Sequence, residues 1–143
     1  MHIMDKGPII KKLDELKGYL RRLEEFRDID EERYADDHHQ YGLAEHYLQH
    51  AVETTLDICR LLVINLEIKI PNDSHELLSL LANEKVLTKE FARRNLKMPG
   101  FRNRLVHQYD DVDHVKTYKY LQEHFSDLQE FINQVSRFLL KQE

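Results

Sequence analysis

The segment GFRNRLVHQY, residues 100–109, gathers side chains that can bind a phosphate and move a proton. Arg102 carries a permanent charge, and its planar guanidinium group matches two phosphate oxygens. Histidine, present here as His107, has an ordinary pKa at which one imidazole can both accept and donate a proton near neutrality. RNA brings its own nucleophile, the 2′-hydroxyl, so a base, an acid and a cation suffice to cleave it. These residue types therefore suffice in principle for RNA cleavage without a metal or a cofactor.

The spacing of these residues matters as much as their types. Arg102 and His107 are five positions apart, which is about 140° around an ideal helix, so they do not share a face. Asn103 and His107 are four apart and do share one. Three arrangements are open: the helix distorts, Arg102 reaches round, or the arginine and histidine that act together come from two chains. In the competing interpretation, Leu105 and Val106 anchor an ordinary helix end whose polar residues are solvated.

Positive charge accumulates just before the motif. Residues 89–104 hold six positive side chains and one negative, in a chain whose net charge is −5. The acidic total argues against attraction of nucleic acid to the whole surface, so any binding would be local. A solvated helix face is the usual explanation of such a charge run. The alternative is that four of these residues guide RNA toward the motif, and they are Arg93, Arg94, Lys97 and Arg104.

The elements that must position the motif are helices. Glycine and proline number four and three in 143 residues, and good helix formers are abundant. No segment shows the alternation of a strand. The first helix is expected to begin near Pro8, and a second helix at Asp36 or Asp37 runs about 30 residues to Pro71. The first helix carries the apolar stripe Ile9, Ile10, Leu13, Leu16, Leu20 and Leu23.

The last long helix is expected to start at Asp111 or Asp113 and to bury a stripe within residues 115–139. Phe131 and Phe138 widen its apolar face beyond one seam. That width indicates a second packing surface and hence a dimer, although a broad contact inside the chain would look the same.

Short helices are expected between the second and last long helices. Ser74 is a candidate N-cap for a helix over residues 77–83, and Thr88 for another that extends to about Lys97. The sequence MPG, residues 98–100, is predicted to end that second short helix.

Together these segments predict an all-α fold, an up-and-down bundle of three long and two or three short helices in one domain, residues 1–143. No run approaches the roughly 18 apolar residues of a membrane span, and the N-terminus lacks the apolar block of a signal peptide. We therefore expect a cytoplasmic protein without a membrane partner. Cys59 lies on the apolar face of the second helix and is expected in the core.

Two other patterns occur on the second helix. His46 and His50 have the spacing of a two-histidine zinc site, but no third ligand is evident, so an exposed polar face and no metal are expected. Glu45, Gln49, Glu53 and Asp57 form a ladder, for which the default is a solvated face. The alternative is that Glu53 or Asp57 faces the motif and holds Arg102 or Arg104.

The motif can also be written as an arginine, four residues, a histidine, one residue and a tyrosine, namely Arg102, His107 and Tyr109. This spacing resembles the signature of HEPN-domain ribonucleases, in particular the HepT-like toxin family. Residues 44–59, AEHYLQHAVETTLDIC, resemble the long second helix of that family, and residues 76–113 resemble its central and motif segments. The order of elements agrees over nearly the whole chain.

The resemblance implies an all-helical homodimer, or a larger even-numbered oligomer, whose two motifs line a shared cleft. It implies metal-independent cleavage of RNA, with tRNA a reported substrate class, by Arg102 and His107 as catalytic residues and Asn103 in support. It also implies a toxin neutralised by a nucleotidyltransferase antitoxin that transfers AMP to the motif tyrosine, Tyr109. A bound AMP would repel and exclude an RNA phosphate there, because it adds negative charge and bulk.

Two alternative functions remain open from the sequence. One is a catalytically silent HEPN dimer that serves as a binding module for the nucleotidyltransferase. The other is a nucleotide-binding regulator.

Overall fold

The computed structural model describes residues 3–107 and 112–142, and within them the backbone alone of His107. The described residues form helices and no strand, as the all-α prediction requires. Three helices are long, namely α1 (Gly7–Arg27), α3 (His38–Asn65) and α7 (His114–Leu140). The shorter ones are α2 (Glu31–Asp36), the 3₁₀ turn η1 (Ser74–Glu76), α4 (Leu77–Asn83), α5 (Lys89–Arg94) and α6 (Met98–His107).

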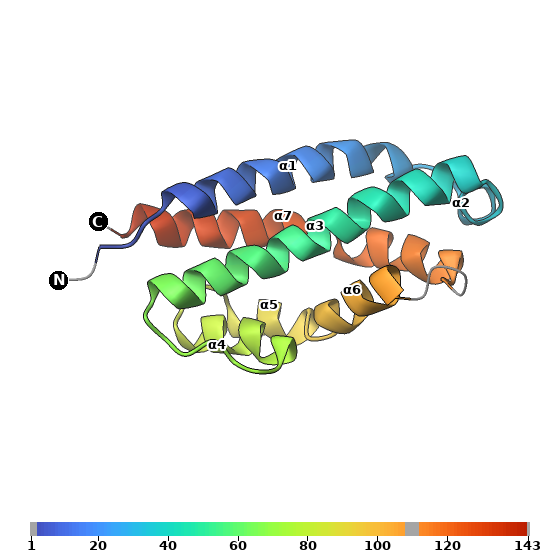
Figure 1. Cartoon of the computed structure of the whole chain (residues 1–143). Helices are drawn as coiled ribbons and strands as arrows, with labels where there is room; N and C mark the ends of the chain where they lie inside the picture. Colours follow the sequence, from blue (N-terminus) through green and yellow to red (C-terminus); the bar gives the residue numbers. More distant parts are fainter. Residues whose placement is uncertain (1–2, 108–111, 143) are drawn as a thin grey trace.

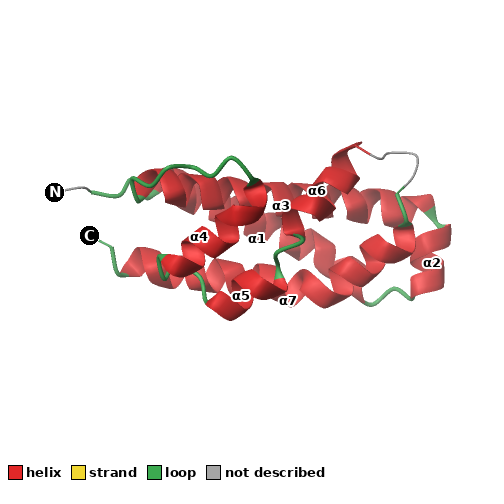
Figure 2. Ribbon diagram, turned by 90° about the horizontal axis from the view of Figure 1, so that it is seen from below, coloured by secondary structure: helices red, strands yellow, loops and turns green. Residues whose placement is uncertain are grey.

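The chain runs along α1, returns along α3, advances again through α4, α5 and α6, and returns along α7 (Figure 1). The bundle therefore has four passes, and the third is broken into α4, α5 and α6. This broken pass faces the viewer in Figure 2. Helix α3 contacts α1, α2, α4, α6 and α7, and so touches every other pass of the bundle. None of the described helices is long and apolar enough to cross a membrane.

The predicted stripe of α1 is confirmed except at one position. Its buried residues are Ile9, Leu13, Leu16, Leu20, Leu23 and Phe26. Ile10 is 47% exposed, because it lies one residue, or about 100°, away from the buried line.

Helix α2 was missed by the sequence analysis, because a six-residue helix has too few apolar positions to show a period. Asp30 caps it by accepting a hydrogen bond from the Arg33 backbone N–H. Its one buried residue, Tyr34, places its hydroxyl 2.9 Å from Oγ1 of Thr117 on α7. The cap and this long-range contact stabilise the helix.

The predicted start of α3 is confirmed, since Asp37 accepts from the His39 N–H at its N-terminus. The predicted end at Pro71 is wrong, because the helix stops at Asn65. There Glu67 adopts a φ of 60°, and the Ile68 N–H donates to the Val63 carbonyl at 3.2 Å. Because this hydrogen bond ends the helix without a glycine or a proline, the sequence contained no compositional signal for the helix end. Cys59 is fully buried, as predicted, and burial raises the pKa of its thiol to about 12.

The predicted cap at Thr88 is confirmed, but the predicted cap at Ser74 is wrong, because Asp73 caps η1 and no side chain caps α4. Two helix ends also differ from the prediction. Helix α5 ends at Arg94, where the Asn95 amide donates back to the Phe91 carbonyl at 2.9 Å. Residues 98–100 do not end a helix but form the first turn of α6. Proline is tolerated there because N–H groups of a first turn have no intrahelical partner.

The start of α7 at Asp113 is confirmed, because its carboxylate accepts from the Val115 and Lys116 N–H groups. The wide apolar face of α7 has an explanation inside the chain. Phe131 is fully buried, and its ring centre lies 6.0 Å from that of Phe91 on α5. Phe131 is therefore no sign of a dimer, and the homodimer stays a prediction.

Candidate active site on helix α6

Apolar contacts fix the motif helix α6 in the bundle. Met98, Phe101 and Leu105 are buried, which is the three-to-four-residue spacing of one helix face. The Phe101 ring stacks on Tyr120 of α7 at 3.7 Å between centres and 5° between planes. With that face inward, the polar residues of α6 must lie along its sides, and Arg102 is accordingly only partly exposed.

Arg102 is held by two neighbours. Its Nε lies 3.6 Å from Oε1 of Glu53 on α3, and its Nη1 donates to Oδ1 of Asn103 at 3.1 Å. Glu53 also accepts from the Gln49 amide at 3.3 Å. Of the two interpretations of the α3 ladder, the structure supports the one in which Glu53 holds the motif arginine. Because a guanidinium has five N–H donors, Arg102 keeps donors for a ligand.

The other end of the ladder is not a solvated face either. Glu45 accepts from Oγ1 of Thr117 at 2.6 Å and lies 2.6 Å from Nδ1 of His114. The His114 ring stacks on Tyr41 at 3.5 Å. Asp57 instead pairs with Arg60 at 3.2 Å and with Lys12 at 3.7 Å. The ladder thus connects α3 to α1, α6 and α7.

The backbone of α6 is helical without interruption from Met98 to His107. A distorted helix is therefore excluded as the explanation of the Arg102–His107 spacing, and the offset of about 140° holds within one chain. The side chain of His107 and the whole of Tyr109 lie outside the described residues, so their predicted roles stay predictions.

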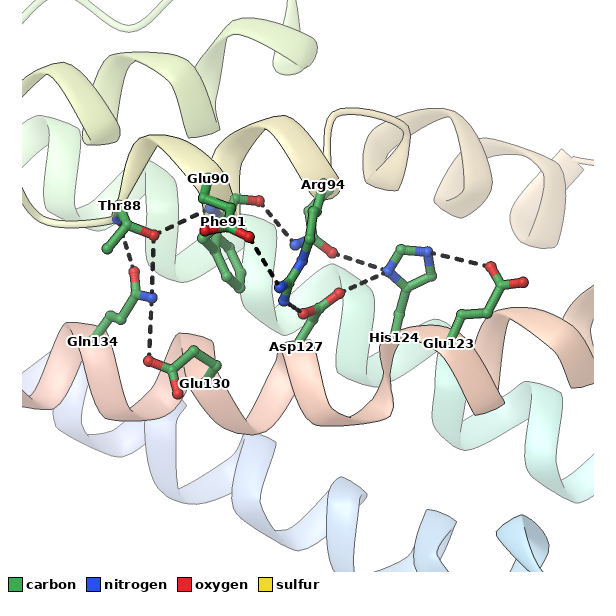
Figure 3. Close-up of polar contacts among 10 residues, drawn as sticks. Thr88, Glu90, Phe91, Arg94, Glu123, His124, Asp127, Glu130 and Gln134 are labelled. Carbon is green, nitrogen blue, oxygen red and sulfur yellow. Dashed lines mark hydrogen bonds and ion pairs between the residues drawn. The ribbon is translucent and has the colours of Figure 1, made fainter.

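The four cations expected to guide RNA differ in their surroundings. Arg93, Lys97 and Arg104 are exposed. Arg94 is bound to the carboxylate of Asp127 on α7 and lies 3.8 Å from Glu90 (Figure 3). Its charge is already compensated, so the other three are the stronger candidates for phosphate contacts.

Asp127 belongs to a buried polar network that the sequence analysis did not single out. Its side chain is 5% exposed, and its Oδ2 lies 3.0 Å from Nδ1 of His124 (Figure 3). Burial lowers the pKa of His124, and Arg94 adds to this effect. The Tyr120 ring lies between His124, at 4.4 Å, and Phe101 of the motif helix. The network therefore fastens α5 to α7 and supports α6 from behind.

Arg102 and Asn103 also line an open hollow of about 240 Å³ between α6, α3 and the segment that leads into α4. Arg60 and His75 lie on the same hollow, although the sequence analysis named neither. No local spacing connects these residues to the motif, since they come from other elements.

No group of three metal-ligating side chains occurs among the described residues. His46 and His50 form an edge-to-face ring pair at 4.5 Å, and His50 stacks on Tyr19 of α1 at 5.5 Å. Aromatic packing against α1 thus accounts for His50.

Comparisons with known proteins agree with this arrangement. A family model described as Ribonuclease HepT-like matches residues 16–135. The tRNA nuclease HepT of Aphanizomenon flos-aquae is 26% identical over 129 residues, which cover 90% of this chain and 88% of that protein. The mRNA nuclease HepT of Shewanella oneidensis is 26% identical over 125 residues, 87% of this chain and 93% of that protein.

A solved structure of the tri-AMPylated Shewanella oneidensis HEPN toxin in complex with MNT antitoxin superimposes with a TM-score of 0.79. The identity is 25%, and the match covers 90% of this chain and 96% of that one. The fold and the motif thus define an all-α protein of the HEPN nuclease class. More narrowly, the chain belongs to the Ribonuclease HepT-like family, and its enzymatic class is that of a ribonuclease.

Proposed function

We propose that this protein is the toxin of a toxin–antitoxin pair and a metal-independent endoribonuclease. The observation that carries the proposal is the oriented guanidinium of Arg102, which Glu53 and Asn103 hold at an open hollow. An arginine fixed in this way is prepared to bind a phosphate and to stabilise the charge that develops there during cleavage.

The reaction that fits these residues uses the 2′-hydroxyl of RNA as nucleophile. A general base removes its proton, and the oxygen attacks the adjacent phosphorus. The bond to the 5′-oxygen breaks, and that oxygen takes a proton from a general acid, which leaves a 2′,3′-cyclic phosphate. His107 is the candidate for proton transfer, and Arg102 stabilises the negative charge that develops on the non-bridging phosphate oxygens.

A homodimer would allow the arginine and the histidine that act together to come from two chains. Within one chain, the backbone positions of Arg102 and His107 lie about 140° apart around α6, because the helix is regular through both. In a dimer with the two α6 helices facing each other, His107 of one protomer serves the phosphate that Arg102 of its partner binds. The twofold axis repeats this arrangement at the second motif, with the roles of the two protomers exchanged.

Control by an antitoxin follows from the same position. The Shewanella oneidensis relative is described as an AMPylated toxin in complex with MNT antitoxin. We propose that a nucleotidyltransferase partner transfers AMP to Tyr109, two residues beyond His107. The added phosphodiester and nucleoside would oppose an RNA phosphate by like charge and by bulk.

Purified wild type and His107→Ala, incubated with total tRNA and with mRNA in EDTA, test the nuclease. We expect the wild type to cut and the variant to cut at least about 100-fold more slowly. Equal cleavage by both proteins would contradict the proposal.

The alternative, a catalytically silent binding module, predicts no cleavage by wild type together with a stable complex with the nucleotidyltransferase. Mass spectrometry of the protein made with and without that partner tests the modification. The mass of one AMP on Tyr109 is expected only with the partner.

A further inference from the structure

The hollow beside Arg102 contains a second set of basic side chains. Arg60 comes from α3, His75 from η1, and Arg102 with Asn103 from α6. Their side chains are partly exposed, at 39% for Arg60, 50% for His75 and 37% for Arg102. A ligand in the hollow can therefore reach all three from solvent.

His75 is held in one orientation by Asp73. The Asp73 carboxylate accepts from the His75 backbone N–H at 2.9 Å and lies 2.8 Å from its ring Nδ1. These two hydrogen bonds lower the pKa of Asp73, so the carboxylate stays ionised and keeps the imidazole in place. The other ring nitrogen, Nε2, is directed toward α6, since it would lie 3.6 Å from a Cβ added to Gly100.

Arg60 is oriented across the same hollow. Its Nη1 donates to Asp57 at 3.2 Å and its Nη2 to Oγ of Ser74 at 3.1 Å. Asp57 shares its charge with Lys12, at 3.7 Å, so this local group of three keeps a net positive charge. Two of the five N–H groups of Arg60 are used in these bonds, which leaves three for a ligand.

The lining of the hollow favours a phosphate over a base. Two guanidinium groups and one carboxylate, that of Asp73, line the hollow. The carboxylates that pair with the two guanidinium groups, Glu53 and Asp57, are not part of its lining. Its described lining contains no Phe, Tyr or Trp on which a base could stack, in contrast to surfaces that bind single-stranded bases. The volume of about 240 Å³ is below the roughly 300–1,000 Å³ of sites for whole drug-sized ligands.

We propose that Arg60 and His75 form a second phosphate subsite, which binds the RNA phosphodiester next to the one held by Arg102. This inference rests on the proposed ribonuclease function and deepens it. The subsite fixes the direction of the RNA strand across α6, because contact with two successive phosphates allows fewer orientations than contact with one.

Binding of a fluorescent 2′-O-methyl RNA, which has no free 2′-hydroxyl and cannot be cut, tests the subsite directly. We expect His75→Gln and Arg60→Gln each to weaken binding by about threefold to tenfold. In Arg60→Gln, which removes a permanent cation, the slope of log K against log salt should also fall in magnitude by about 0.7. The matched controls are His46→Gln and Arg21→Gln, whose residues lie on α3 and α1 outside the hollow, and both should bind like wild type.

Cleavage assays then separate the subsite from the nuclease activity itself. In the variants KM should rise while kcat stays near the wild-type value, because the subsite binds ground state and transition state alike. Replacing each flanking phosphate in turn with a neutral methylphosphonate should raise the wild-type KM at one position, and should have little effect there on His75→Gln.

Three results would overturn the subsite. They are wild-type binding and salt dependence in both variants, a loss of kcat at unchanged KM, and equal weakening in the control variants. A loss of kcat would instead assign His75 to proton transfer. If the wild type binds this RNA through Arg60 and His75 but cleaves no RNA, the proposed nuclease activity is wrong and the proposed phosphate subsite stands. Because His75 is exposed, its variant should fold even if Arg60→Gln does not, which thermal melts of both would check.

Discussion

Two regions of this protein use the same residue types with opposite outcomes. Behind α6, Arg94, Asp127 and His124 form a network around a carboxylate that is 5% exposed (Figure 3). In front of α6, Arg102 pairs with Glu53, whose side chain is 28% exposed, at an open hollow. The two arginines differ little, since Arg94 is 49% exposed and Arg102 37%, so the contrast lies in the carboxylates. Burial of Asp127 makes the first set a structural clamp, because its charge is matched by Arg94 inside the bundle. Partial exposure leaves the second set free to exchange a weak internal contact for a ligand.

The largest expected effect would test the open side of this comparison. Arg102→Ala should lower kcat/KM for RNA cleavage by about 100- to 1,000-fold, because a preorganised cation at the reacting phosphate is lost. Its melting temperature should stay close to that of wild type, since the side chain is partly exposed. Cleavage kinetics and thermal melts check both, with Arg21→Ala on α1 as control. Loss of folding with Arg102→Ala would erase the contrast between the two regions.

The closed side should show the reverse pattern. Arg94→Ala leaves Asp127 buried without its guanidinium partner, and we expect it to lower the free energy of unfolding by about 2 kcal/mol. This figure is below that for a fully buried pair, because Arg94 is 49% exposed and His124 still contacts Asp127. Urea denaturation measures the change, and Arg93→Ala, which removes an exposed charge, is the control. If Arg94→Ala folds but binds RNA far more weakly than Arg93→Ala, Arg94 contacts RNA and is not only a structural residue.

Glu53→Gln would sharpen the role of orientation. The substitution keeps the shape of the side chain and removes the charge that holds Arg102. We expect a fall in kcat/KM of about tenfold or less, with a change in unfolding free energy within about 0.5 kcal/mol. Steady-state kinetics beside Glu25→Gln, the same substitution at an exposed residue of α1, would show whether the effect is specific. An unchanged rate would mean that Asn103 alone suffices to position Arg102.

The smallest effect concerns pH. Because burial lowers the pKa of His124 below its ordinary value of 6.5, the unfolded chain binds this proton more readily than the folded one. The contribution of His124 to stability is therefore complete above about pH 6.5 and is lost as pH falls toward its depressed folded-state pKa. His124→Gln should flatten the fall in melting temperature between about pH 7 and pH 5.5. Parallel curves for wild type and variant would show that His124 is not held neutral.

Local features of the chain sufficed to predict most of the helices. Thr88 was predicted as a cap, and Asp37 and Asp113 were each one of two predicted candidates, because a short polar side chain before a periodic apolar run has a direct local effect. One failure came from a long-range contact, and another from the local preference of proline for the first turn of a helix. Tyr34 stabilises α2 through Thr117, and Pro99, taken as a helix end, lies in the first turn of α6.

The candidate site divides in the same way. The sequence by itself determined the motif, the basic run before it and the helix that carries them, because residue type and helical period are local properties. Only the tertiary structure decided that Glu53 holds Arg102, that Asp127 takes Arg94, and that residues from α3 and η1 share one hollow with α6. The reason is that a helix period fixes which residues share a face, while packing of the apolar faces fixes which charged faces meet.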